Sequence, residues 1–158
     1  MLGKLRFFIL LLVIAIGSTS FDVRVISSVT ILELVNKDRA AYGLPALTLN
    51  PTLTLAALSK AQDMLTHNYF SHVSPNGTKP WHWFKSLGYE YTYAGENLAA
   101  GFEDPFELER QWMDSPEHRA NILSPLYHDV GLAIVEKENK TVIVQFFGSR
   151  ASSLTLHR

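Results

Sequence analysis

The 158-residue sequence contains no cysteine. Disulfide bonds therefore cannot stabilise the fold, and a thiolate nucleophile, a cysteine metal site and a lipid-modified cysteine are all excluded. The sequence also lacks a strong charge of either sign, since 14 basic and 15 acidic residues leave a formal net charge of −1. No block of lysine and arginine follows residue 6. The basic surface of a nucleic-acid-binding protein is therefore absent, and we expect no nucleic-acid partner.

A hydrophobic run long enough to span a bilayer is also missing. The run Phe7–Ile16 has about ten residues, where a spanning helix needs roughly 20. Lys4 and Arg6 precede it and small residues follow at 18–20, which is the order of segments in a secretory signal peptide. We therefore expect residues 1–20 to be a signal peptide, the protein to be secreted or otherwise extracytoplasmic, and no stable membrane span to remain after cleavage. A short uncleaved anchor is the alternative.

The composition is that of one globular domain, with 47% hydrophobic and 18% charged residues. After a lead-in over residues 21–28, apolar positions recur at helical spacing as far as residue 123, and continuous β-branched and aromatic runs follow. We expect the domain to occupy residues 29–150 and a tail to occupy 151–158. Helices are predicted at 29–42, 50–65, 80–87, 104–113 and 115–123, loops at 44–49 and 67–79, and strands at 130–135 and 141–147.

The order of these elements predicts the fold class. Helices that come first and strands that come last indicate an α+β fold, with helices packed on an antiparallel sheet. The polar segment Glu136–Lys140 joins the two strands as a β-hairpin. Because both strands are apolar nearly throughout, we expect helices to cover both faces of the sheet.

Three polar residues beside aromatic segments are the candidates for chemistry: His72, Glu96 and His118. His118 follows Ser115-Pro116 and lies near the first turn of a helix, where the helix dipole disfavours protonation. A neutral imidazole is what a divalent metal requires. Two histidines and a carboxylate with an open position form a ligand set known from catalytic zinc sites.

A structural reading of the same residues stays open. A histidine beside aromatics is often a half-buried, hydrogen-bonded side chain, and Glu96 before Asn97 can simply brace a loop. Arg119 and Asn121 are expected to satisfy backbone groups rather than to touch a substrate. The sequence has no HExxH helix that would fix two ligands on one face. It also has no G-x-S-x-G nucleophile elbow and no glycine-rich phosphate loop.

At these segments the sequence resembles the CAP superfamily of cysteine-rich secretory proteins, antigen 5 and pathogenesis-related proteins. The resemblance is strongest to the short, cysteine-free SCP-like domains of bacteria, and it covers residues 29–149. The matching segments occur in family order: Leu34-Val35-Asn36 with Arg39, Gly43-Leu44 with Leu47, Tyr69-Phe70-Ser71-His72 with Ser74-Pro75, Gly88-Tyr89, Gly95-Glu96-Asn97, Trp112-Met113 with Ser115-Pro116, His118-Arg119-Ala120-Asn121-Ile122-Leu123, Gly131, and Gln145-Phe146-Phe147-Gly148.

The resemblance implies an α-β-α sandwich with a small antiparallel sheet between helical layers and a further strand near residues 95–97. It also implies a central cavity lined by two histidines and two acids, which binds divalent metal in some members. The histidines fall on His72 and His118 and one acid on Glu96. This sequence departs from the family at the second acid, because neither Asp114 nor Glu117 is a clean match.

Three functions follow as hypotheses. The first is a binding protein whose cavity takes a divalent, zinc-like metal ion, a small or lipidic ligand, or both. The second is a metal-dependent hydrolase, a protease or cell-envelope enzyme, with Glu96 as third ligand or general base. The third is a non-catalytic domain that acts through its surface. The missing second acid weakens the hydrolase, so the binding role ranks first.

Overall fold

The computed structural model describes residues 26–150. The predicted signal peptide over residues 1–20 and the tail over 151–158 lie outside the described residues. The elements are α1 (Ser28–Ala41), β1 (Thr48–Leu49), α2 (Pro51–Thr66), α3 (Trp81–Ser86), β2 (Tyr91–Ala100), α4 (Pro105–Asp114), α5 (Pro116–Ile122), β3 (Asp129–Lys137) and β4 (Lys140–Arg150). All five predicted helices and both predicted strands are present.

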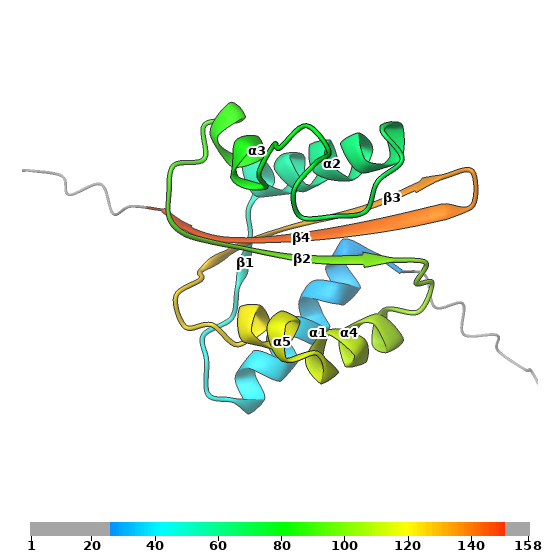
Figure 1. Cartoon of the computed structure of the whole chain (residues 1–158). Coiled ribbons are helices and arrows are strands. Elements are labelled where there is room, and N and C mark those ends of the chain that lie inside the picture. The colour runs from blue at the N-terminus through cyan, green and yellow to red at the C-terminus, as the bar shows by residue number, and fades with distance from the viewer. Residues whose placement is uncertain (1–25, 151–158) are drawn as a thin grey trace, which may run out of the picture.

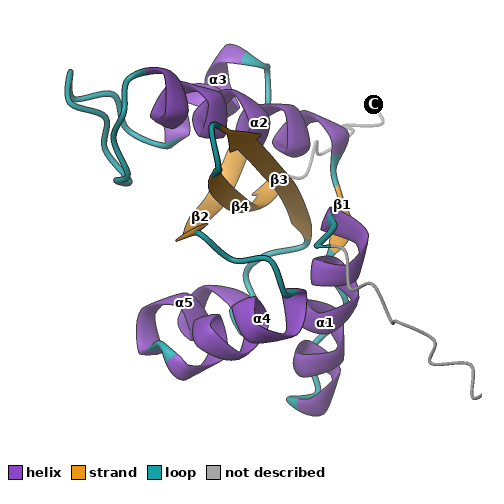
Figure 2. Ribbon diagram, turned by 90° about the vertical axis from the view of Figure 1, so that its right-hand side faces the viewer, coloured by secondary structure: helices purple, strands orange, loops and turns teal. Residues whose placement is uncertain are grey.

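One mixed sheet forms the middle layer, in the strand order β1-β3-β4-β2. Helices α2 and α3 lie on one face, and α1, α4 and α5 lie on the other (Figure 1). Figure 2, turned by 90°, shows the same three layers. The prediction that both faces of the sheet are covered is therefore confirmed, and so is the α-β-α sandwich.

The strand at the edge of the sheet matters most for the site. β2 pairs with β4 in antiparallel fashion from Tyr91–Arg150 to Ala100–Val142, and β4 pairs with β3 as the predicted hairpin. β2 has no second neighbour in the strand order, so its outer side lies at the rim of the sheet. The strand expected near residues 95–97 is thus this edge strand.

One prediction about the N-terminal half was wrong. The segment 44–49, expected to be a loop, contains the two-residue strand β1, which pairs in parallel with β3 at Thr48–Asp129 and Leu49–Val130. Two residues are too few to display the alternation of apolar and polar side chains by which strands are recognised. This strand forms only by pairing with β3, and the sequence of residues 44–49 alone does not predict that pairing.

Local chemistry explains where the helices begin. The side chain of Asn50 accepts hydrogen bonds from the backbone N–H groups of Thr52 and Leu53, and Pro51 follows at a position that needs no N–H donor. Asp104 caps α4 in the same way through the N–H of Phe106. Within residues 26–150, no helix combines the length and hydrophobicity that a membrane crossing requires.

The core is divided by the sheet into two apolar clusters. The cluster under α2 and α3 contains Leu53, Met64, Phe84, Tyr89, Leu98 and Phe146, and the cluster under α1, α4 and α5 contains Ile31, Val35, Leu108, Trp112, Ile122 and Phe147. Most of these side chains are fully buried. Two filled clusters fix the position of the sheet edge relative to both helical layers.

Candidate functional site

The structure brings two of the three predicted residues into contact. Glu96 lies on β2, two residues before Leu98, so its side chain faces the layer of α2 and α3. His72 lies in the loop between α2 and α3, and its Nδ1 is 2.5 Å from Oε1 of Glu96. The Glu96 side chain is 2% exposed, whereas that of His72 is 57% exposed. A buried carboxylate therefore holds an imidazole that faces solvent.

Burial sets the charge of Glu96. Loss of hydration raises the pKa of this carboxyl to about 7, while the hydrogen bond and charge of His72 and the charge of Lys60 act in the opposite direction. The second oxygen, Oε2, is buried and has no hydrogen-bond partner among the described residues. Near neutral pH the carboxyl therefore exists in both protonation states.

His118 approaches the same edge of the sheet from the opposite layer. Burial lowers the pKa of its imidazole, and the charge of His72 lowers it further. The reduced basicity expected from the sequence is present, with burial rather than the helix dipole as its first cause. The ring of His118 also lies 6.5 Å from the ring of Trp112. The effect of His72 on the pKa shows that the two imidazoles are near enough for their charges to interact.

The three predicted residues are divided between two grooves. His72 and Glu96 line a groove of about 400 Å³, together with Trp81. His118 lines another of about 330 Å³, together with Phe70 and Trp112. Trp81, Phe70 and Trp112 therefore form walls of the grooves. Trp83, by contrast, is buried in the core.

Neither Asp114 nor Glu117, the two candidates for the second acid, lies beside Glu96 in the described part of the chain. Asp114 is exposed and lies 3.6 Å from Arg110 of its own helix. Glu117 is also exposed, and it acts on the site only by opposing the lowered pKa of His118. Neither carboxylate lines either groove. Among residues 26–150, the candidate site therefore contains one carboxylate and two imidazoles.

The three predicted donors are not arranged as one metal centre. Within residues 26–150, no group of three or more His, Cys, Asp and Glu side chains is placed to hold a metal ion. In the contact between His72 and Glu96, Nδ1 and Oε1 bond to each other, so these two atoms are not available as metal ligands. A centre with three direct ligands does not fit this arrangement. Two imidazoles remain as donors, and Glu96 orients one of them.

Amide side chains tie the two halves of the site together. Asn121 of α5 donates to the backbone carbonyl of Glu96 at 3.1 Å and to Oδ1 of Asn97 at 2.9 Å. Asn97 donates in turn to the backbone carbonyl of His118 at 3.2 Å. These bonds connect β2 to α5 directly beside Glu96 and His118. The expectation that Asn121 satisfies backbone groups is confirmed.

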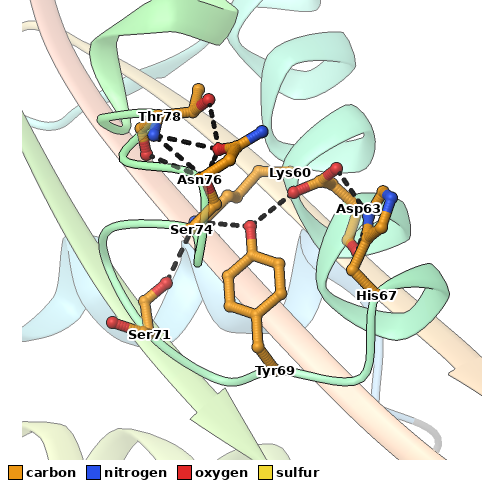
Figure 3. A network of polar contacts seen from close by, with 8 residues as sticks. All are labelled: Lys60, Asp63, His67, Tyr69, Ser71, Ser74, Asn76 and Thr78. Carbon is orange, nitrogen blue, oxygen red and sulfur yellow. Dashed lines mark hydrogen bonds and ion pairs between the residues drawn. The ribbon is translucent and has the colours of Figure 1, made fainter.

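A buried lysine, which sequence reasoning missed, holds the loop that carries His72. Lys60 of α2 is 0% exposed, and its Nζ donates to the backbone carbonyls of Ser71 and His72, each at 3.0 Å. It also donates to the hydroxyl of Tyr69 at 3.2 Å. Figure 3 shows the lysine entering the loop beside Tyr69 and Ser71. Lys60 therefore fixes the backbone from which His72 projects.

Burial and neighbouring charges have opposite effects on the pKa of Lys60. Burial lowers the pKa of its ammonium, and the charges of Glu96 and Asp63 raise it. The hydroxyl of Tyr69 donates to Oδ2 of Asp63 at 2.5 Å, which continues the network (Figure 3). The sequence did contain a signal for this residue, because Lys60 interrupts the apolar stripe Leu53, Ala56, Ala57, Ala61 and Met64 of α2.

Comparisons with known proteins show the family of this chain. The pattern of CAP, the cysteine-rich secretory protein family, matches residues 32–147. The chain belongs to the CAP family. Its relative YkwD of Bacillus subtilis (strain 168) is 42% identical over 106 residues, which are 67% of this chain and 41% of YkwD. The membrane protein YlbC of the same strain is 30% identical over 107 residues, 68% of this chain and 31% of YlbC. The matched region is thus less than half the length of these curated relatives.

Solved structures of CAP proteins share the fold. An extracellular protein of Bacillus anthracis that contains an SCP domain superposes with a TM-score of 0.69 at 29% identity, over 77% of this chain and 39% of that one. An outer surface protein of Borrelia burgdorferi gives a TM-score of 0.72 at 21% identity, over 77% of this chain and 90% of that one. The CAP fold is therefore present here without a single disulfide bond.

The buried carboxyl predicts a pH dependence that is specific to Glu96. Its pKa in the folded state, about 7, exceeds the ordinary value of 4.5, so the folded protein binds more protons than the unfolded chain between these values. The stability that the neutral carboxyl contributes is complete below pH 4.5 and is lost as the pH rises to 7. We expect the free energy of unfolding, relative to Glu96→Gln, to fall by on the order of 2 kcal/mol from pH 4.5 to 7.5.

Urea unfolding of both proteins at several pH values measures this difference. His118, whose pKa is lowered, also makes the free energy of unfolding depend on pH. Because both proteins retain His118, its contribution cancels in the difference between them. A difference that stays constant across this range would show that Glu96 ionises like an exposed acid.

Proposed function

We propose that this CAP protein acts outside the cytoplasm as a binding protein, and that His72 and His118 hold a divalent, zinc-like metal ion at the edge of the sheet. A small or lipidic ligand would occupy the grooves beside it. The observation that carries the proposal is the contact between His72 Nδ1 and the buried Glu96. A metal-binding histidine typically has a carboxylate partner of this kind on its other ring nitrogen.

Glu96 has a positioning role in this proposal. A carboxylate at Nδ1 retains the ring proton there, so the lone pair of the His72 imidazole lies on Nε2. The carboxylate also fixes the plane of a ring that is otherwise more than half exposed. The lowered pKa of His118 keeps the second imidazole neutral near pH 7. Both histidines are thereby prepared to donate to a cation, which would polarise a ligand oxygen when bound.

The proposed location rests on two observations. The N-terminal segment has the order of a signal peptide. The structural relative from Bacillus anthracis is an extracellular protein. An extracytoplasmic protein without cysteine is independent of the redox state of its surroundings.

A hydrolase is the second candidate, favoured by the pKa of Glu96. A carboxyl with a pKa of about 7 is suited to exchange protons at neutral pH. Its geometry is less suitable, because Oε1 is bonded to His72 and Oε2 is buried. The carboxylate would have to leave both positions to reach a water molecule in the groove. For this reason binding is the better account.

Removal of both histidines tests the proposal. We expect residues 21–158 to bind one Zn²⁺ per chain and the His72→Ala/His118→Ala variant to lose at least 100-fold in affinity. The reason is that two of the donor atoms are removed. Titration calorimetry and metal analysis after dialysis measure the effect, with circular dichroism as the check on folding.

The chain offers a matched control for this experiment. His67 and His82 are histidines away from the two grooves, so His67→Ala/His82→Ala should keep the affinity of the parent protein. Equal losses in both double variants would indicate adventitious binding to surface histidines. No zinc binding by the parent protein near pH 7 would contradict the metal proposal and favour a domain that acts through its surface.

A further inference from the structure

A second acidic residue is buried in the opposite helical layer, far from His72 in the sequence. Glu109 of α4 is 5% exposed. Both of its carboxyl oxygens are buried, and neither has a hydrogen-bond partner among the described residues. A buried carboxyl group that receives no hydrogen bond is rarely ionised in a protein interior, because its charge loses hydration without compensation.

The carboxyl of Glu109 lines a groove between α1 and α4 with a volume of about 340 Å³. Asp38 of α1 lines the same groove. Burial raises the pKa of Glu109 to about 8, and the charge of Asp38 and a hydrogen bond between the two carboxyl groups, formed when one of them is protonated, raise it as well. Two basic residues, Lys37 and Arg110, complete the charged groups of the groove. Arg110 is directed toward Asp114, at 3.6 Å.

The remaining lining of the groove is apolar and aromatic. Leu34 and Met113 form part of its walls. The rings of Tyr42 and Phe106 also line the groove and are 62% and 48% exposed. Aromatic faces attract organic cations, and the aliphatic walls match a short methylene chain. Two neighbouring carboxyl groups with such walls fit an amine better than they fit a bare metal ion.

We propose that the groove between α1 and α4 binds a primary ammonium group on a short aliphatic chain, with Glu109 and Asp38 as its counter-ions. When both carboxyl groups are ionised they repel each other and no described donor bonds to Glu109, so the ammonium group supplies the missing hydrogen bonds. A divalent cation is a poorer occupant, because it needs about six or more oxygen ligands and the groove offers only two carboxylates. Either a free alkylamine or a lysine side chain has the required chemistry.

Proton release distinguishes this binding mode from simple apolar contact. In the empty groove at pH 6.5 the Glu109 carboxyl is protonated, and the entering ammonium group displaces that proton to the solvent. The affinity for an amine should therefore rise about tenfold or more between pH 6.5 and pH 8.5. An alkylamine remains protonated throughout this range, since its pKa resembles the value of about 10.4 for lysine.

The experiment is an NMR titration of residues 21–158 with n-butylammonium chloride at both pH values. This segment contains every described helix and strand. We expect shifts of the amide signals of α1 and α4, and at least tenfold weaker binding of n-butanol, which has the same aliphatic chain without the charge. Glu109→Gln keeps the shape of the side chain and should weaken amine binding at pH 8.5 at least tenfold. Glu107→Gln changes an exposed acid of the same helix and should have no effect.

Three outcomes would overturn the proposal: equal binding of the alcohol and the amine, unchanged affinity in Glu109→Gln, or an affinity that does not depend on pH. A blocked lysine peptide identifies the source of the ligand. Tighter binding of the peptide than of n-butylammonium points to a lysine side chain, and equal binding points to a free amine. Either result requires that the Glu109→Gln variant binds both more weakly.

Discussion

Replacement of Lys60 by methionine is expected to lower the free energy of unfolding by on the order of 3 kcal/mol. The variant leaves the carbonyl groups of Ser71 and His72 and the hydroxyl of Tyr69 without their common donor. Each buried polar group that loses its partner costs about 1–3 kcal/mol, and the apolar side chain recovers part of this by packing between α2 and the loop. The midpoint of urea unfolding measures the loss.

The loop should respond more strongly than the rest of the fold. Without the ammonium group, the backbone of His72 is no longer held to α2, so amide hydrogen exchange should increase at residues 69–74 before it increases in the sheet. Lys85→Met, which alters an exposed lysine of α3, is the matched control and should change neither quantity. Unaltered exchange in the loop of Lys60→Met would show that Lys60 does not position His72.

Much of the fold could be predicted from the sequence because its signals are local. The caps Asn50 and Asp104, each followed by proline, mark where α2 and α4 begin. The apolar runs of β3 and β4 are long and are separated by a polar turn. β1 could not be predicted, because its two residues become a strand only through pairing with β3.

The sequence indicated candidate residues for the site but not how they contact one another. The family motifs indicated that His72, Glu96 and His118 approach one another. They could not reveal that Glu96 bonds to His72 rather than remaining a free ligand, since this depends on how α2 and β2 enclose the carboxyl. The buried side chains of Lys60 and Glu109 were not predicted either, because a single polar residue within the apolar face of a helix does not show which partners it meets.

The position at which α2 meets the sheet supports the other large prediction. Gly131 of β3 faces α2, and a Cβ atom there would overlap the backbone carbonyl of Leu53. The helix cannot simply shift away. The backbone N–H of Asn50, just before α2, donates to the carbonyl of Val130 at 2.8 Å, so the start of the helix is attached to the same strand. Only glycine permits this approach of two backbones.

We therefore expect Gly131→Ala to lower the free energy of unfolding by about 3 kcal/mol or more, the upper end of the cost of overpacking, because the overlap involves backbone rather than a flexible side chain. Gly77→Ala is the control. That glycine has a φ of +85° and open space around it, so its substitution should cost only about 1–2 kcal/mol of backbone strain. Equal losses in the two variants would refute the close packing of α2 on β3. Because α2 carries Lys60, Gly131→Ala should also release the loop of His72 and weaken zinc binding in the fraction that still folds.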